Sequence, residues 1–264
     1  MIAVCIVTYN QESFIGKAIE SVLTQECDES LRIYIGNDAS TDDTDAICSR
    51  YAAQDKRITY VRHESNHGLV KNTIDLYMRI LADGADYIAM LDGDDYWTDT
   101  HKLQKEIDYL RQHTEYGFIH TAAQEAHGEQ IINSTMCNPP VGDLRHRYNL
   151  LGARHTNCTV LFRANLLNKN ELKEIQSLSF PVLDYPLYGL FSTRTLFAYL
   201  DFTTAVWTNH TSVSSPITWK TYIRYKKERL RMWRWLAKKE PKYFKFSPFS
   251  AIIWYVKQVI GFFL

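Results

Sequence analysis

The stretch DYIAMLDGDDYW, residues 86–97, runs from an apolar segment directly into three carboxylates within four residues. The apolar part predicts a buried β-strand. Asp92, Asp94 and Asp95 repel one another, and such a cluster is costly when no cation is near. We therefore expect a positively charged ligand where this strand ends.

The chain before this stretch alternates apolar and amphipathic segments. Strands are predicted at 2–10, 31–38 and 57–63, and helices at 13–25, 39–54 and 67–84, the last closed by Gly84. This order predicts an α/β fold, a mostly parallel sheet with helices on both faces. Ligands bind beyond the carboxyl ends of such strands, where polar residues stand in this chain.

The second half is less regular. The predicted elements are a helix running into a strand at 108–123, a loop at 127–156, a strand at 157–163, a helix at 163–175, a turn and helix at 179–195, and a strand at 196–209. Without a repeat or a low-complexity linker, the sequence predicts one compact unit followed by a tail.

Composition excludes several classes. The five cysteines are scattered and form no CxxC pair, which favours reduced thiols over a disulfide framework or a zinc site. The start, MIAVCIVTYN, is interpreted as a first strand rather than a signal peptide. No apolar run reaches the roughly 20 residues of a membrane span. These features predict a cytoplasmic protein.

Acids one residue apart at a strand end can hold Mg²⁺ or Mn²⁺, which take few carboxylates and fill the remaining positions with water and phosphate oxygens. Gly93 removes a side chain where a ligand could approach. The competing interpretation is an acidic turn that caps the next helix, and for a lone DxD this alternative is the commoner one.

Taken together, four stretches resemble the inverting nucleotide-sugar glycosyltransferases of family 2, which have the GT-A fold. They are VTYN at 7–10, IGNDASTD at 35–42, NHGLVKN at 66–72 and LDGDDYW at 91–97, with weaker matches at 157–163, 184–192 and 210–214. The resemblance implies a nucleotide-sugar half at 1–120 and an acceptor half at 121–219 of one domain.

The resemblance also implies roles for single residues. Asp38 would accept a hydrogen bond from N3–H of uracil or thymine, although Asn37 replaces the more usual acid before it. The implied donor-binding residues are Val7, Thr8, Tyr9, Asp38, Lys71, Asp92 and Gly93, with Asp94 on the metal and Asp95 behind it. Asn157, Thr159 and Arg163 fall in the segment that shapes the acceptor pocket.

An inverting transfer needs a base for the acceptor hydroxyl. Asp184 matches the family acid at the start of a helix in the second half. His210 matches a histidine that closes on the metal or diphosphate. The other eight histidines show no ligand spacing along the chain.

Each role has a simpler alternative. Asp38 and Asp184 could cap helices, and Tyr9 could be a core aromatic residue. Lys71 and His210 could be solvated surface residues. Trp97 is interpreted as packing. For the acids, the joint pattern favours the ligand roles.

The tail, 220–264, holds twelve Lys/Arg and two Glu, although the whole chain has a net charge of zero. Nucleic-acid binding is one interpretation, but nothing else in the chain supports it. The favoured one is a basic amphipathic tail on the inner, anionic face of a membrane. The alternative is packing on the enzyme body or in a dimer.

The predicted function is metal-dependent transfer from a nucleotide-sugar, most simply a UDP-sugar, to a glycan or lipid-linked glycan. One alternative is a magnesium-dependent phosphotransferase or phosphatase, for which LDGDDYW lacks the expected Thr. Another is a non-catalytic nucleotide- or glycan-binding protein, which would not need Asp94 and Asp184 together.

Overall fold

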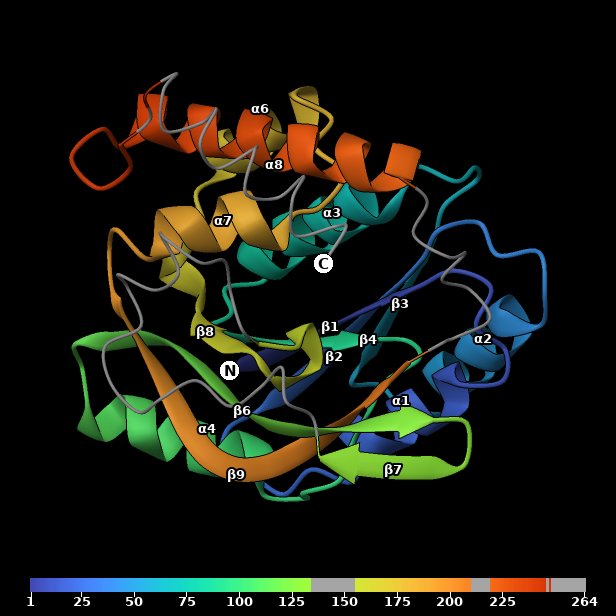
Figure 1. Ribbon diagram of the computed structural model, residues 1–264. Helices are drawn as coiled ribbons and strands as arrows, with labels where there is room; N and C mark the ends of the chain where they lie inside the picture. The colour runs from blue at the N-terminus through green and yellow to red at the C-terminus, as the bar shows by residue number, and fades with distance from the viewer. Residues whose placement is uncertain (134–154, 210–218, 246, 248–264) are drawn as a thin grey trace.

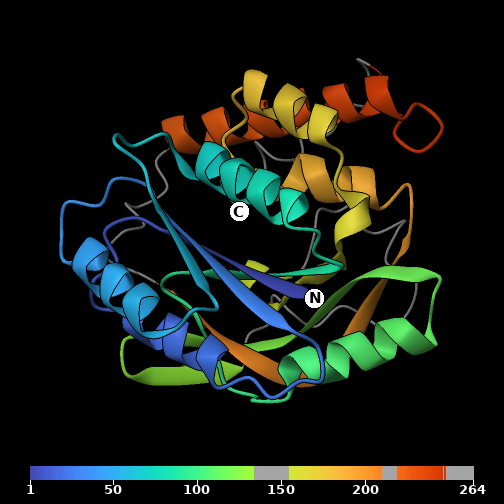
Figure 2. The same cartoon turned by 180° about the vertical axis from the view of Figure 1, so that it is seen from behind.

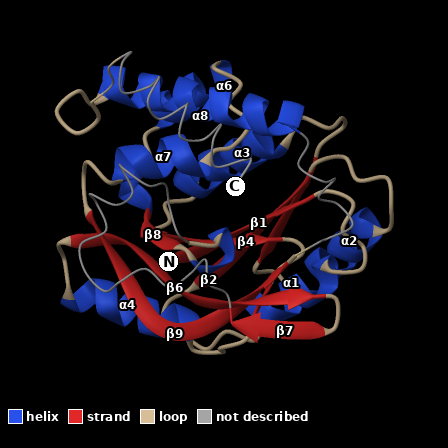
Figure 3. Ribbon diagram, viewed as in Figure 1, coloured by secondary structure: helices blue, strands red, loops and turns tan. Residues whose placement is uncertain are grey.

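The computed structural model describes residues 1–133, 155–209, 219–245 and 247. Within these ranges a nine-stranded sheet lies between two groups of helices (Figures 1 and 3). The strands are β1 (Ile2–Thr8), β2 (Leu31–Asn37), β3 (Ile58–Arg62), β4 (Tyr87–Asp92), β5 (Tyr96–Trp97), β6 (Tyr116–His127), β7 (Gln130–Asn133), β8 (Leu161–Arg163) and β9 (Leu196–Thr208). The helices are α1 (Ile15–Leu23), α2 (Thr44–Gln54), α3 (Leu69–Ala82), α4 (Lys102–Gln112), α6 (Lys169–Ser177), α7 (Asp184–Phe191) and α8 (Trp219–Lys239).

The strand order is β3-β2-β1-β4-β8-β6-β9-β5, with β7 paired to β6. β1 to β4 form the predicted parallel block, in which β1 pairs with both β2 and β4. Beyond it the sheet becomes mixed, since β8 is antiparallel to β4 and β6 while β9 is parallel to β6. The predicted boundary at residue 120 falls inside β6, so the two halves share one sheet.

Side chains of β1 alternate between two cores. Ile2, Val4 and Ile6 pack with α1 and α4, whereas Ala3, Cys5 and Val7 belong to the core beneath α3 and α7. Helices therefore cover both faces, as the continuous apolar run predicts. Figure 2 shows α1, α2 and α4 along one side and α3, α6, α7 and α8 along the other.

Three expectations for the second half need correction. The predicted strand at 157–163 begins as a 3₁₀ turn, Asn157–Thr159, so that only Leu161–Arg163 pair as a strand. The helix predicted at 163–175 begins later, because the Asn168 side chain accepts from the amides of Asn170 and Glu171 and caps α6 there. Within the predicted loop at 127–156, Gln130–Asn133 form a hairpin with β6.

The basic segment after residue 219 packs on the protein. One side of α8 buries Met232 and Leu236, and Leu236 contacts α7 closely enough that a Cβ on Gly189 would lie 2.7 Å from it. Trp235 donates to Glu174 of α6 at 2.9 Å. The apolar side of this helix therefore faces the body of the protein. The apolar end of the tail, to which the alternative interpretation applied, is not described. Residues 248–264 lie outside the described ranges.

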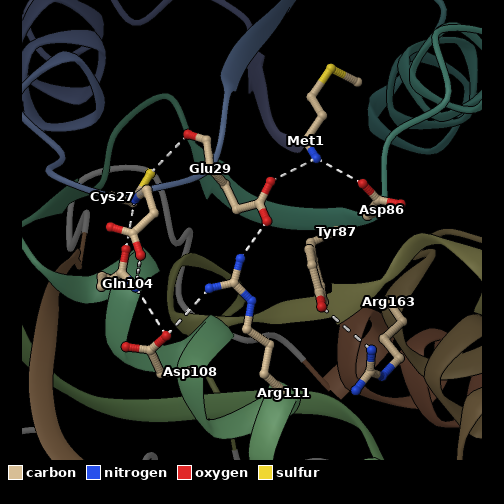
Figure 4. A network of polar contacts seen from close by, with 10 residues as sticks. Met1, Cys27, Glu29, Asp86, Tyr87, Gln104, Asp108, Arg111 and Arg163 are labelled. Carbon is tan, nitrogen blue, oxygen red and sulfur yellow. Dashed lines mark hydrogen bonds and ion pairs between the residues drawn. The ribbon is translucent and has the colours of Figure 1, made fainter.

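A polar network joins the amino-terminal ends of β1 and β4 (Figure 4). The amino group of Met1 lies 3.1 Å from the Glu29 carboxylate and 2.7 Å from that of Asp86, and Arg111 of α4 pairs with Glu29. These contacts lie at the opposite ends of the strands from the polar residues expected to bind ligand. None of the helices in the described ranges is long and apolar enough to cross a membrane.

Candidate active site

A cleft of about 450 Å³ opens at the carboxyl ends of β1, β2 and β4. It lies where the parallel topology predicts a ligand site. Gln11, Asn66 and Trp207 also line it, although the sequence pattern gave no role to any of them. Seven residues named from the sequence line the cleft, and they are Val7, Thr8, Tyr9, Asp38, Asp92, Asp94 and Asp95.

Asp38 is 3% exposed and holds the loop before α3. One carboxylate oxygen accepts from the amide of His67 and the other from the amide of Gly68, both at 2.7 Å. The following residue, Ala39, has φ of 61°, a left-handed conformation that costs energy for a non-glycine residue. The Asp38 carboxylate thus contacts the loop before α3, whereas the alternative interpretation placed it as a cap on the helix that follows it. Its contact with a nucleobase stays a prediction.

The end of β1 forms the floor and rim of the cleft. Tyr9 is 45% exposed and lines the cleft, so it is not a core aromatic residue. Thr8 donates to the Gln11 side chain at 2.8 Å. A Cβ on Gly93 would lie 2.5 Å from Gln11 and 2.9 Å from Thr8. A side chain at position 93 would therefore collide with Gln11 and Thr8. A contact between Gly93 and the donor stays a prediction.

The acidic turn after β4 concentrates negative charge. Removal from water, repulsion from Asp94 and repulsion from Asp184 raise the pKa of Asp92 to about 7. Asp95 is 2% exposed, and burial together with repulsion from Asp92 and Asp94 raises its pKa well above the ordinary value. A divalent cation would stabilise all three ionised carboxylates, so the donor set fits a metal of the Mg²⁺ or Mn²⁺ type.

Thr208, the last residue of β9, fixes this turn from the second half of the chain. Its amide donates to the Asp95 carboxylate at 2.8 Å, and its hydroxyl donates to the backbone carbonyl of Asp94 at 2.6 Å. Asp95 therefore accepts a hydrogen bond from the last residue of β9, and its role behind a metal-binding Asp94 stays a prediction.

A second, smaller cavity of about 170 Å³ lies beside the cleft and shares Asp92 with it. Asp184, at the start of α7, lines this cavity together with Asn157 and Tyr188. The Tyr188 hydroxyl donates to Asn157 at 2.9 Å, and the Asn157 amide points at Asp92 at 3.4 Å. The fold thus brings the predicted base and the strand-end acid to one hollow.

The surroundings of Asp184 suit a proton acceptor. Desolvation by the protein raises its pKa above the ordinary value, although part of the side chain still meets solvent. Arg229 of α8 opposes this effect electrostatically, and its guanidinium lies 4.9 Å from the ring of Tyr185. A carboxylate with a raised pKa is a stronger base than an ordinary one.

Three further residues were named from the sequence. Lys71 lies on α3, where its ammonium nitrogen is 2.9 Å from Nδ1 of His67, and it is not among the residues that line the cleft. His210 lies outside the described residues. Arg163 donates to the carbonyls of Tyr116 and Leu110, which gives it a structural role at the edge of β8.

The comparisons with known proteins agree with this geometry. The family model described as "Glycosyl transferase family 2" matches residues 3–166. The chain belongs to glycosyl transferase family 2. The family match favours neither the phosphotransferase nor the non-catalytic alternative.

Two relatives illustrate the sequence similarity. The chain is 36% identical over 110 residues to Uncharacterized protein Rv1520 of Mycobacterium tuberculosis, covering 41% of this chain and 31% of that protein. It is 28% identical over 190 residues to the UDP-Glc:alpha-D-GlcNAc-diphosphoundecaprenol beta-1,3-glucosyltransferase WfaP of Escherichia coli, covering 72% of this chain and 68% of WfaP. The chain therefore spans about a third of the length of the mycobacterial relative.

Solved structures confirm the predicted GT-A fold. TarS of S. aureus in complex with UDP-GlcNAc has a TM-score of 0.63 at 16% identity, covering 95% of this chain and 69% of TarS. The mannosyltransferase PcManGT of Pyrobaculum calidifontis, in complex with GDP-Man and Mn²⁺, has a TM-score of 0.58 at 15% identity, covering 90% of this chain and 64% of PcManGT.

Proposed function

We propose that this glycosyltransferase moves a sugar from a UDP-sugar to a hydroxyl of a surface-glycan acceptor, with inversion and with the help of Mn²⁺ or Mg²⁺. The observation that carries the proposal is a single cleft with Asp38 on one wall and the acidic turn on another. A uridine would lie between Tyr9 and Asp38, and the pyrophosphate would reach Asp94.

The choice of uridine rests on two kinds of support. Asp38 is fixed by two backbone amides, and each carboxylate oxygen can accept a further hydrogen bond, such as one from N3–H of the base. TarS binds UDP-GlcNAc, and WfaP is named for transfer from UDP-Glc. PcManGT binds GDP-Man with a similar fold, so the fold alone does not select the base.

Asp94, with Asp92 beside it, would hold the cation in this proposal. The metal would neutralise charge on the departing diphosphate. PcManGT contains Mn²⁺ in its complex, which supports this assignment. His210 stays a predicted partner of the metal or diphosphate, and Lys71 stays a predicted contact of the donor.

Asp184 is proposed as the base that accepts the proton of the acceptor hydroxyl as that oxygen attacks the anomeric carbon. Asp184 and Asp92 line the same cavity, which supports a base beside the proposed donor site. Asn157 and Tyr188 orient Asp92 from the far wall of that cavity. The acceptor would enter on the α7 side, while the donor occupies the β1 and β2 side.

The test of this function is hydrolysis and binding across donors. We expect slow, metal-dependent hydrolysis of UDP-sugars, and UDP with Mn²⁺ should raise the melting temperature, because a ligand that binds the native state stabilises it. dTDP-sugars and GDP-sugars serve as the competing donors. Equal hydrolysis of UDP-, dTDP- and GDP-sugars would contradict the proposal. Stabilisation by UDP that requires neither Asp38 nor a metal would also contradict it.

We further propose that α8 places the enzyme on the inner face of an anionic membrane, near a lipid-linked acceptor. Its outward side carries four exposed cations, Arg224, Lys227, Arg234 and Lys238. Arg231, which lies between them in sequence, instead pairs with Glu228 and donates to the carbonyls of Leu178 and Ser179. Each basic residue near an anionic surface contributes about 1 kcal/mol of attraction. The apolar side already packs on α7, so the attraction would be mainly electrostatic.

Sedimentation with vesicles tests this placement. The protein should bind vesicles rich in phosphatidylglycerol and release them at high salt, since salt screens exposed charges. The triple variant Arg224→Gln, Lys227→Gln and Arg234→Gln should lose most of this binding. A matched variant at exposed cations elsewhere (Arg32→Gln, Arg50→Gln and Lys56→Gln) should keep it. Equal binding by both triple variants would refute the role of α8.

A further inference from the structure

Two histidines and an aspartate lie close together outside the cleft, near the amino-terminal half of α3. His63 follows β3, His67 lies in the loop before α3, and Asp75 lies on the helix. The nearest ligand atoms of the three residues all lie within 4.8 Å of one another. They line a surface hollow of about 610 Å³ that is separate from the cleft. The spacing along the chain gave no sign of this cluster, because it combines a loop with a helix.

The hydrogen bonds of His63 leave one of its ring nitrogens ready to bind a metal. The Nδ2 of Asn72 donates to the carbonyl of Gly36 at 2.8 Å, so Oδ1 of Asn72 must be an acceptor. That oxygen lies 3.1 Å from Nε2 of His63, which therefore carries the proton. In the neutral ring Nδ1 then keeps its lone pair. Metal-binding histidines are oriented by such hydrogen bonds at the other nitrogen.

His67 already attracts a cation. The ammonium nitrogen of Lys71 lies 2.9 Å from Nδ1 of His67, so the lysine donates to the ring. A metal bound by His67 would have to displace this ammonium group or work against its charge. Asp75 lies one helical turn beyond Lys71 and supplies the negative charge that a divalent ion needs. Two imidazoles and a carboxylate favour Zn²⁺ over Mg²⁺, because Mg²⁺ prefers oxygen ligands alone.

The cluster lies behind the wall of the cleft. Asp38 binds the amides of His67 and Gly68 from the inner side, while Asn66 and Gly68 face the cleft. An ion held by His63, His67 and Asp75 would restrain the same loop from the outer side. A restrained loop loses less conformational freedom when a nucleotide binds against it, and binding is then tighter.

We propose that His63, His67 and Asp75 bind Zn²⁺, and that this ion restrains the loop at 63–68 and so strengthens nucleotide binding in the cleft. The coupling to nucleotide rests on the proposed function, whereas zinc binding at the cluster does not. Coupling between two sites is reciprocal, so UDP must tighten zinc binding by the same factor by which zinc tightens UDP binding.

Zinc affinity tests the site itself. The full chain, with excess Mg²⁺ to occupy the acidic turn, is titrated with Zn²⁺ against a chelating indicator and with Co²⁺ followed by visible absorption. We expect one saturable site, weakened at least about 10-fold in His63→Gln, His67→Gln and Asp75→Asn, in line with the losses that follow changes around metal sites. His113→Gln, a histidine on the opposite side of the sheet, should bind as the unaltered chain does.

Lys71→Met separates the cluster from chance surface binding. Removal of the competing ammonium should tighten zinc binding several-fold, whereas a metal bound elsewhere would not respond. Circular dichroism shows whether each variant is folded. Unchanged zinc affinity in His63→Gln and His67→Gln, or no response to Lys71→Met, would overturn the site.

The coupling is measured as the UDP affinity with and without Zn²⁺. Zinc should tighten UDP binding in the unaltered chain and leave it unchanged in Asp75→Asn. If zinc binds at the cluster and UDP affinity does not change, the proposed coupling is wrong. If UDP does not bind under any condition, the proposed function fails, while the zinc titration still decides the metal site.

Discussion

The cleft has two acidic walls, Asp38 and the acidic turn after β4, and their carboxylates are stabilised in different ways. Asp38 is buried, yet both of its oxygens accept hydrogen bonds from backbone amides at 2.7 Å. Asp92, Asp94 and Asp95 are crowded together, and the pKa values of Asp92 and Asp95 are raised by burial and mutual repulsion. The Asp38 carboxylate is stabilised by hydrogen bonds within the protein, whereas the acids of the turn would be stabilised most by a bound cation. Substitutions on the two walls should therefore affect different properties.

The largest effect on activity should come from Asp184, the proposed base beside the acidic turn. Asp184→Asn removes the proton acceptor while it keeps the shape of the side chain, so transfer should fall by about 10²–10⁴-fold. UDP binding, measured by thermal shift with Mn²⁺, should stay unchanged because Asp184 lies in the neighbouring cavity. Retained turnover would contradict the assignment, and so would an equal loss of UDP binding.

A second substitution tests the acidic wall itself. Asp94→Asn should lower metal-dependent turnover by about 10²–10³-fold, the effect of losing several kcal/mol of charge stabilisation. The fold should persist, and the metal-free protein should unfold at a temperature at least as high, because one repulsion is removed. Asp108→Asn on α4 is the matched control. A strong loss of stability in Asp94→Asn would mean that the acids serve internal contacts.

Substitution of Asp38, on the other wall, should lower the stability of the protein. Asp38→Ala removes the carboxylate partner of the His67 amide and leaves the Gly68 amide with only the Asn66 side chain, 3.1 Å away. A donor that loses its partner away from water costs about 1–3 kcal/mol. Urea denaturation should show this loss of stability even without nucleotide. Asp38→Asn should recover part of it, because the amide oxygen can still accept from one of the two amides. A stable Asp38→Ala protein would show that the loop before α3 is held by other contacts.

The smallest effect is a pH dependence. Since the pKa of Asp92 is raised to about 7, this carboxylate gains a proton as the pH falls through neutrality. A neutral Asp92 attracts a cation less, so Mn²⁺ affinity should fall by up to about 10-fold per pH unit below 7. The metal-free protein should show the reverse trend in stability. A group with a raised folded-state pKa stabilises the fold below its unfolded pKa, and this stability is lost as the pH rises towards 7.

Affinity for Mn²⁺ can be measured at pH 5.5 to 8 by titration calorimetry. Chemical denaturation over the same range follows the stability of the metal-free protein. A flat Mn²⁺ profile would mean that Asp92 is ionised throughout and that the crowding is relieved by other groups.

Much of the first half could be predicted from the sequence, because each buried strand ends in polar residues and the parallel topology brings those ends together. Thr8, Tyr9, Asp38 and Asp92 meet in this way. Trp207 and the hydrogen bonds of Thr208 to the acidic turn could not be predicted, since they depend on how β9 returns beside β6 and β5. Gln11 lies shortly after β1, but its side chain carries no signal that distinguishes it from an ordinary loop residue.

The tail shows a different limit of sequence analysis. Its apolar residues at helical spacing fit a membrane surface and a protein surface equally well. Only the three-dimensional structure shows that Met232 and Leu236 are buried against the protein, while Arg224, Lys227, Arg234 and Lys238 are exposed. Likewise, His63, His67 and Asp75 have no recognisable spacing, because a loop and a helical turn bring them together.

Thr208 has a practical consequence for recombining such enzymes. Because of its two hydrogen bonds to Asp94 and Asp95, the conformation of the acidic turn depends on a residue far away in the chain. A chimera that joins the first half of this chain to another second half would lose the turn's geometry unless the incoming strand supplies a hydroxyl and an amide at this point. Junctions for domain exchange are therefore better placed after residue 208 than at the midpoint of the chain.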